Sequence, residues 1–126
     1  MPSANHMTTP ISVDEEEIEI RFAALEGFTV GFETYKQDLD PTPLFKGLPD
    51  DRCQCPHWGF VTSGQVTYRW ADHEETYVEG DAYYVPPGHL PLMTSGTRVV
   101  EFSPSVEMAA TMAVVDSNLA AANASS

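Results

Sequence analysis

Residues 58–89 read WGFVTSGQVTYRWADHEETYVEGDAYYVPPGH. Short runs of β-branched and aromatic residues alternate here with turn signals, the clearest being Ser63-Gly64 and Glu79-Gly80-Asp81. We therefore predict four strands, over residues 58–62, 65–70, 76–78 and 82–85. Strands this short and this closely spaced are typical of an all-β sandwich or barrel.

Further strands are predicted on both sides of this segment. Residues 18–23 and 28–35 alternate apolar and polar positions with the period of two that a strand requires, and residues 98–102 form a last strand. Residues 1–13 are polar and are expected to form a disordered or loosely ordered tail, in which His6 is solvated. Residues 38–51 are rich in proline and are expected to be a loop.

The C-terminal part of the chain changes to a helical pattern over residues 104–122. Ser103 suits a helix N-cap, and Pro104 suits the first helical position that follows it. Apolar residues then recur every three or four positions, at Met108, Met112, Val115 and Leu119. This is one face of an amphipathic helix. We expect the face to pack on the barrel or, alternatively, to form a dimer contact.

The totals limit the class of protein. A chain of 126 residues is long enough for one domain. Its net charge is −13, from 6 Lys and Arg against 19 Asp and Glu, which disfavours binding to nucleic acid or to an anionic membrane and favours solubility. We find neither a secretory signal nor the run of about 20 apolar residues of a membrane helix, so we expect a cytoplasmic protein with reduced cysteines.

Residues 51–59, DRCQCPHWG, contain the strongest chemical signal. Side chains at positions i, i+2 and i+4 of a strand share a face, so Cys53, Cys55 and His57 would point the same way if the segment is extended. His89 follows Pro86-Pro87-Gly88, a turn that would direct it back toward the same interior. Thiolates and imidazoles suit zinc or iron(II), and also copper.

Plainer interpretations stay open. Reduced cysteines are often small core residues, and a single histidine such as His57 is often structural. A disulfide between Cys53 and Cys55 is disfavoured by the tight loop and by a reducing compartment. A cysteine beside His57 would, alternatively, be an activated thiolate. His73 lies at a predicted turn and is expected to be exposed.

The segment from Cys53 to Pro104 resembles a small single-domain cupin. Gly80, Pro86 and Gly88 match the second cupin motif, which is a glycine, five residues, a proline, any residue and a glycine. The 15 residues between Gly64 and Gly80 match the short connection of compact members.

The first cupin motif is matched with different residue types. Counting back from Gly64, His57 stands where the family has its metal-binding glutamate, and Cys53 and Asp51 stand at its His-x-His pair. This set resembles a bacterial subgroup with Cys-x-x-x-His and Pro-Pro-Gly-His motifs. The histidine of the second motif is usually three residues after the glycine, where this chain has Pro91; His89 comes directly after the glycine.

The resemblance implies a cupin-type double-stranded β-helix, that is, a jelly-roll barrel over residues 14–103, with a metal site inside and a homodimeric assembly. Cys53, His57 and His89 are ranked as ligands ahead of Cys55, which shares their face but has no family position. Asp51 has a family position but lies at the edge of a loop. Residues on flanking strands are expected mainly to pack, although some would line a pocket: Tyr68, Trp70, Tyr83 and Arg98.

Two functions follow from these expectations. The first is a metal-binding cupin acting as a metal-dependent enzyme, with zinc or iron(II) and a small-molecule substrate. Three protein ligands and one open coordination position would favour it. The second is a non-catalytic module that binds a small ligand or a metal for sensing or storage, which four protein ligands in a closed site would favour.

Overall fold

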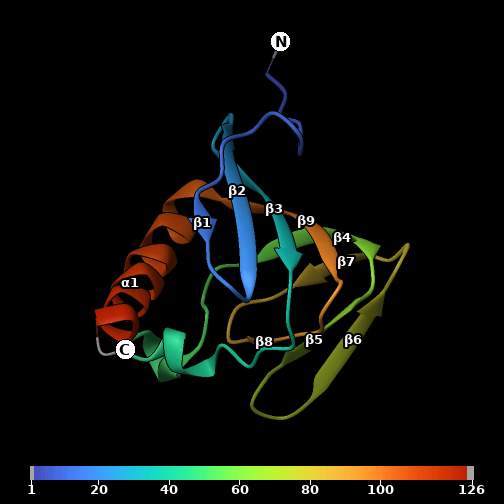
Figure 1. The fold of residues 1–126 in the computed structure, drawn as a ribbon. Helices are drawn as coiled ribbons and strands as arrows, with labels where there is room; N and C mark the ends of the chain where they lie inside the picture. The colour runs from blue at the N-terminus through green and yellow to red at the C-terminus, as the bar shows by residue number, and fades with distance from the viewer. Residues whose placement is uncertain (1, 125–126) are drawn as a thin grey trace.

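Two antiparallel β-sheets make up most of the computed structural model, which describes residues 2–124 (Figure 1). The strands of the larger sheet lie in the order β1-β2-β3-β9-β4-β7. In chain order they are β1 (Val13–Asp14), β2 (Ile18–Leu25), β3 (Phe28–Tyr35), β4 (His57–Ser63), β7 (Ala82–Val85) and β9 (Arg98–Pro104). The smaller sheet has the order β6-β5-β8. Its strands are β5 (Gln65–Arg69), β6 (Glu74–Val78) and β8 (Leu90–Met93).

The two sheets pack face to face around one core. Its most deeply buried side chains come from both sheets: Tyr35, Val61, Val66, Tyr68, Val85 and Val99. Burying a valine side chain contributes roughly 1.5–3 kcal/mol, so these positions account for much of the stability of the sandwich. The predicted all-β fold is thus confirmed. Within residues 2–124 the strand pairing gives two separate sheets, so the expected jelly-roll barrel is observed as a sandwich.

Gly64 forms the corner at which the chain passes from β4 in one sheet to β5 in the other. Its φ of +78° lies in the left-handed region, and a Cβ atom there would lie 2.5 Å from Thr97 Oγ1. That hydroxyl accepts the Gln65 N–H at 3.1 Å and donates to the Gln65 carbonyl at 2.8 Å. Glycine is therefore needed at this corner for both conformation and space.

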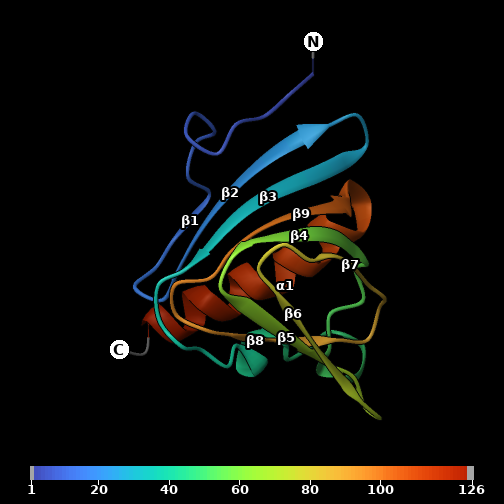
Figure 2. The same ribbon diagram turned by 90° about the vertical axis from the view of Figure 1, so that its right-hand side faces the viewer.

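One helix, α1 (Ser105–Ala124), lies along an open side of the sandwich (Figure 2). It packs against the short 3-10 helix η1 (Thr42–Phe45), which is followed in the chain by a second one, η2 (Pro49–Asp51). Its predicted apolar positions lie in a second cluster that it shares with η1 and the cysteine segment: Phe45, Cys53, Cys55, Leu90, Met108, Met112, Val115 and Leu119. The Asn118 amide donates to the carbonyls of Leu44 and Lys46 at 2.7 and 2.9 Å. Within the described chain no helix is long and apolar enough to cross a membrane.

The helix begins one residue later than the sequence pattern predicts. Pro104 pairs with Phe28 across β3 and β9, so it is the last residue of a strand rather than the first of the helix. Proline has no backbone N–H, but the last residue of a strand does not need to donate one to the hydrogen-bond ladder of the sheet.

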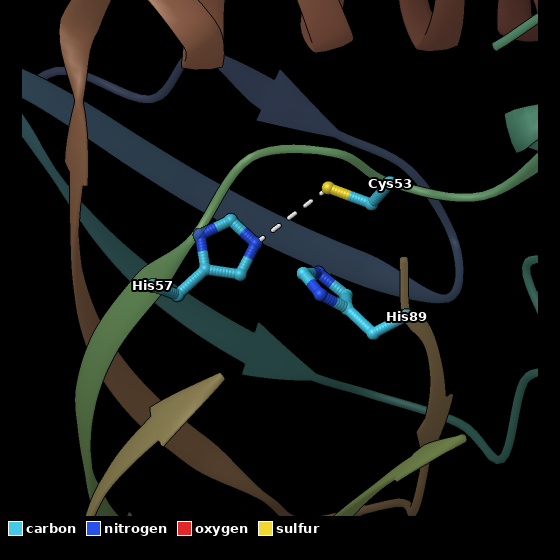
Figure 3. A group of neighbouring side chains, drawn as sticks. All are labelled: Cys53, His57 and His89. Carbon is cyan, nitrogen blue, oxygen red and sulfur yellow. Dashed lines mark hydrogen bonds between the residues drawn. The ribbon is translucent and has the colours of Figure 1, made fainter. Parts of the chain in front are cut away.

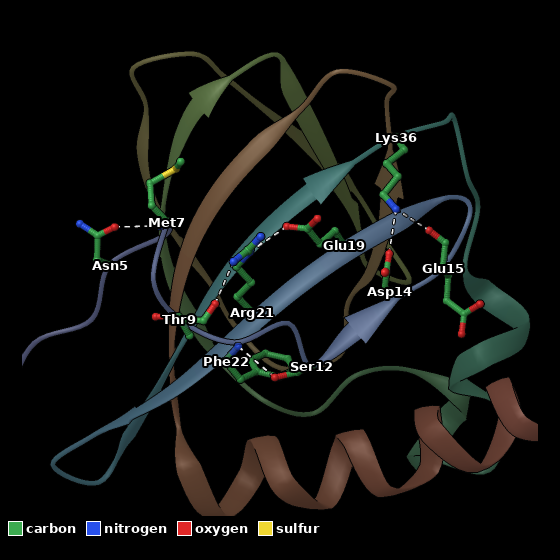
Figure 4. Close-up of polar contacts among 10 residues, drawn as sticks. All are labelled: Asn5, Met7, Thr9, Ser12, Asp14, Glu15, Glu19, Arg21, Phe22 and Lys36. Atoms are coloured by element: carbon green, nitrogen blue, oxygen red, sulfur yellow. Dashed lines mark hydrogen bonds and ion pairs between the residues drawn. The ribbon is translucent and has the colours of Figure 1, made fainter.

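Residues 2–12 contain no strand or helix, yet they contact β2 (Figure 4). Thr9 is buried, and its carbonyl accepts a hydrogen bond from Arg21 Nη1 at 2.9 Å. The His6 ring stacks on Phe32 with the ring centres 5.6 Å apart. His6 is therefore partly covered rather than fully solvated as expected.

Candidate metal centre

Three of the predicted ligands converge inside the molecule. The ligand atoms of Cys53, His57 and His89 all lie within 4.8 Å of one another, and all three residues are buried. Cys53 Sγ is 3.8 Å from His57 Nε2, and the two imidazole rings are 4.9 Å apart (Figure 3). We refer to these three residues as the Cys–His–His cluster.

The backbone places each member of the cluster separately. His57 is the first residue of β4. Cys53 and His89 form an isolated β-bridge, in which the Cys53 N–H donates to the His89 carbonyl at 2.9 Å and the Gly88 N–H to the Cys53 carbonyl at 2.8 Å. Gly88 has a φ of +92°, a conformation that side chains rarely adopt. This glycine therefore turns the chain so that His89 faces Cys53.

Hydrogen bonds orient both imidazole rings. His89 Nδ1 lies 2.8 Å from the Pro86 carbonyl, which can only accept, so Nδ1 carries the proton and Nε2 has a free lone pair. His57 Nδ1 lies 2.7 Å from Ser103 Oγ, which leaves its Nε2 facing Cys53. Histidines that bind metals usually have their second ring nitrogen held in this way.

Burial controls the protonation of the cluster. Desolvation lowers the pKa of His57, and desolvation together with the neighbouring His57 lowers the pKa of His89 to about 4. Both rings are therefore neutral at pH 7. Burial also raises the pKa of the Cys53 thiol to about 11, so this thiol is not an activated nucleophile in the metal-free protein.

The donor set and its spacing fit a divalent ion. With Zn–S of about 2.3 Å and Zn–N of about 2.0–2.1 Å, a sulfur and a nitrogen on one tetrahedral zinc lie about 3.6 Å apart. The observed 3.8 Å between Cys53 Sγ and His57 Nε2 is close to that value. Two imidazoles and a thiolate are ligands that both zinc and iron(II) accept.

The other two ligand candidates lie apart from the cluster. Residues 54–56 are not in a strand, so the alternation expected for Cys55 does not hold. The Cys55 side chain is fully buried below the helix, and its Sγ lies 3.5 Å from the Pro56 carbonyl. Asp51 is exposed, and its carboxylate accepts the Gly47 N–H at 3.0 Å.

A cavity of about 340 Å³ borders all three members of the cluster. This volume is at the lower end of the range for small-molecule sites. Its walls come from the inner face of β2 and from the helix, and they are mainly apolar: Ile18, Ile20, Phe22, Met108, Met112, Val115 and Leu119. The cluster therefore faces a space that a small ligand can occupy.

No family model matches the sequence, and no curated protein matches it. Solved structures do match the fold. An RmlC-like cupin from Shewanella frigidimarina NCIMB 400 aligns with a TM-score of 0.55 at 13% identity, over 80% of this chain and 88% of that one. The chain has the cupin fold.

Two further structures align with this cupin fold over most of their length. A protein of unknown function from Rhizobium leguminosarum bv. viciae 3841 gives a TM-score of 0.59 at 14% identity, covering 82% of this chain and 95% of that one. KdgF from Halomonas sp. gives 0.53 at 13% identity, covering 79% and 90%. At such identities the likeness concerns the fold, and the site must be argued from its own residues.

Inside the cupin fold, a second group of polar residues lies near the Cys–His–His cluster. We call it the acid–tyrosine cluster, and its members are Glu33, Tyr35, Tyr68, Tyr83 and Glu101. The hydroxyls of Tyr68 and Tyr83 both donate to Glu101 Oε2, the latter at 2.5 Å. Tyr35 donates to Glu33 at 3.2 Å, and the two carboxyl groups hydrogen-bond to each other.

The strand register explains why Glu101 fits inside. One row of paired residues crosses four strands in the order Gly31, Glu101, Gly59 and Tyr83. The two glycines leave space on both sides of the Glu101 side chain. The Tyr83 ring lies over Gly59, so its hydroxyl reaches the carboxylate on the next strand.

The two carboxyl groups of the acid–tyrosine cluster hold different charges. Burial and the nearby charge of Glu101 raise the pKa of Glu33 well above its usual value. Burial alone would also raise the pKa of Glu101, but His57 in its protonated form and, at any pH, the hydrogen bonds donated by Tyr68 and Tyr83 lower it. At neutral pH the pair therefore has one proton on Glu33 and one negative charge on Glu101.

We expect Glu33→Gln to make the stability of the metal-free protein less dependent on pH. The folded chain keeps a proton on Glu33 that the unfolded chain releases near its ordinary pKa of 4.5. The wild type therefore loses stability as pH rises from 4.5 toward the raised pKa, whereas the neutral amide does not. Urea unfolding at about pH 5 and about pH 8 measures this, with the exposed-turn variant Glu79→Gln as control. An unchanged pH dependence in Glu33→Gln would contradict the assignment.

The residues that were predicted to line a pocket or to be exposed lie in different parts of the structure. Tyr68 lines the cavity, whereas Tyr83 approaches it only through Glu101. Trp70 Nε1 donates at 3.2 Å to the Pro86 carbonyl that also holds His89. Arg98 is exposed, and so is His73, as expected.

Proposed function

We propose that this cupin-fold protein binds one divalent ion, zinc or iron(II), through Cys53, His57 and His89, and acts as a metal-dependent enzyme on a small molecule. The observation that carries the proposal is the convergence of three buried ligand atoms beside a cavity. The hydrogen bonds support it: the Pro86 carbonyl accepts from His89 Nδ1, and His57 Nδ1 is bonded to Ser103 Oγ, so both Nε2 atoms face inward.

Three features favour catalysis over a purely structural ion. Three protein ligands leave a coordination position for water or substrate, and the bordering cavity gives it access. A bound ion would supply Lewis-acid chemistry or activate a water molecule. The acid–tyrosine cluster adds a proton donor in Glu33 and a proton acceptor in Glu101, which is what general acid–base chemistry requires.

A non-catalytic binding module is the second candidate. Each member of the acid–tyrosine cluster already has a partner inside the cluster, as in a network whose role is structural. A metal with an exchangeable water and turnover that depends on it would favour the enzyme. A metal held without an exchangeable ligand would favour the module.

Elemental analysis of the purified protein, combined with anomalous scattering at the metal edge, tests metal binding directly. We expect about one zinc or iron per chain, located between the three ligand atoms. A protein that purifies without metal and does not take up zinc, iron(II) or cobalt(II) under reducing conditions would refute the proposal.

We expect zinc binding at neutral pH to release one proton per ion. The two histidines are already neutral, because their pKa values lie below the usual 6.5, whereas the Cys53 thiol, with a pKa of about 11, must lose its proton. Between the ordinary histidine pKa of 6.5 and the Cys53 pKa of about 11, the logarithm of the zinc affinity should therefore rise by about one per pH unit. Calorimetric titration in two buffers with different ionisation enthalpies counts the protons, and zero protons released would contradict thiolate ligation.

A further inference from the structure

The charges around the cavity are all of one sign. Its lining within residues 2–124 contains five carboxyl side chains and neither lysine nor arginine: Glu15, Glu17, Glu33, Asp40 and Glu101. Of two nearby cations, one pairs outside the lining and the other pairs with the lining residue Asp40, so Asp40 adds no unpaired charge. Lys36 pairs with Asp14 at 3.1 Å, and Arg69 pairs with Asp40 at 3.1 Å without lining the space itself.

An anionic ligand would find no lysine or arginine partner among the described residues of this lining. A divalent ion bound by one thiolate has one net positive charge, and the negative charge that the Glu33–Glu101 pair holds offsets it. A carboxylate or phosphate would also lie near the half-buried carboxyl groups of Glu15 and Glu17 and against apolar walls without a cation. Burying an unpaired charge in such surroundings is strongly unfavourable.

The hydrogen-bonding groups at the deep end favour a ligand that donates. The donors of the acid–tyrosine cluster are three hydroxyls and one shared proton, and all are used inside it. Every oxygen of its two carboxyl groups has two lone pairs, which leaves acceptors in excess. An amino group has only donors when it is protonated, and the carboxyl groups of the lining attract it.

We propose that the cavity selects a small organic amine with a largely apolar body, and that it discriminates against carboxylates and phosphates of the same size. The amino group would lie near Glu101 and Glu33, and the apolar body would pack against the helix residues Met108, Met112 and Leu119. This inference rests on the proposed function for its reaction. Its selectivity follows from the cavity lining alone and can be measured without metal.

The test uses three probes with one six-carbon skeleton: hexylamine, hexanol and hexanoate. Their dissociation constants are measured by two-dimensional NMR titration of the full chain, first without metal and then loaded with zinc. We expect hexylamine to bind at least about tenfold more tightly than hexanoate in the metal-free protein, with hexanol between them. Equal or tighter binding of hexanoate, or binding of none of the three, would overturn the inference.

Variants locate the selectivity. Glu101→Gln and, at a half-buried position of the same lining, Glu17→Gln should each reduce the preference for hexylamine over hexanoate. Asp116→Asn removes the same charge from an exposed helix position outside the lining and should leave the preference unchanged. A preference that neither cavity variant reduces would overturn the inference, and Glu17→Gln keeps this test available if Glu101→Gln does not fold.

The two proposals fail in different ways. If the chain binds one zinc but prefers hexanoate, the metal centre stands and the amine selectivity is refuted. If the metal-free chain prefers hexylamine but binds no metal, the selectivity stands and the metal-dependent function is refuted.

Discussion

Replacing Cys53 by alanine should lower the zinc affinity by at least about a hundredfold, whereas the same change at Cys55 should have little effect. Both cysteines are free and buried, and they are only two residues apart. They differ in geometry, because only Cys53 has its Sγ beside the two imidazoles. Competition against a chromophoric chelator under reducing conditions measures both affinities. Cobalt(II) substitution adds a thiolate charge-transfer band that Cys53→Ala should abolish.

The pair of cysteine variants controls for packing. Each one removes a buried sulfur from the same apolar cluster below the helix. Thermal unfolding of the metal-free proteins should therefore show similar losses of stability, so a difference in zinc affinity would be due to ligation. If Cys55→Ala loses affinity as strongly as Cys53→Ala, the site has four protein ligands, and the non-catalytic module becomes the better proposal.

Gly59→Ala should lower the free energy of unfolding by about 1–3 kcal/mol, the usual cost of overpacking a core. A Cβ atom at Gly59 would lie 2.4 Å from Tyr83 Cζ and 2.8 Å from Tyr83 Cε2, closer than packed atoms allow. The ring would have to move, and its hydrogen bond to Glu101 would be lost. Urea unfolding of the metal-free protein measures the change.

A double-mutant cycle identifies the cause. In a Tyr83→Ala background the added methyl group has space, so Gly59→Ala should cost much less there. Gly31→Ala provides a comparison on the other side of Glu101, where the nearest side-chain atom, Phe22 Cε1, is 3.1 Å away. We expect that variant to be milder. Equal costs of Gly59→Ala in both backgrounds would show that Tyr83 is not the obstacle.

The strands that follow a simple alternation could be predicted closely from the sequence. Residues 28–35 and 82–85 form strands with the predicted bounds. Strand β8, over Leu90–Met93, was missed because Pro91 interrupts the pattern. That strand lies at the edge of the smaller sheet, where a missing N–H is tolerated. The local sequence pattern does not show which strands will lie at the edge of a sheet.

The candidate site was predictable only where its residues are close in sequence or follow a turn motif. Cys53, His57 and His89 met these conditions. The acid–tyrosine cluster did not, because Glu33 and Glu101 are brought together by the pairing of β3 with β9. Glu101 of β9 pairs with Gly31 of β3, and Glu33 lies two residues after Gly31 in β3. The two carboxyl groups are therefore diagonal neighbours across the sheet. The register between β3 and β9 depends on pairing across the whole sheet, so the local sequence does not predict it.

Trp70 and His89 share the carbonyl of Pro86 as a hydrogen-bond acceptor, which makes Trp70 a fluorescent reporter close to the metal centre. Trp70 donates its indole N–H to the same oxygen that holds His89, and the two rings are 6.3 Å apart. The chain has two tryptophans, and Trp58 is 44% exposed on the outer face of the larger sheet. We therefore expect the emission of Trp70 to respond to the state of His89 and also to that of His73, on which its ring stacks with the centres 4.7 Å apart. Intrinsic fluorescence thus links a spectroscopic signal to the state of the buried histidine.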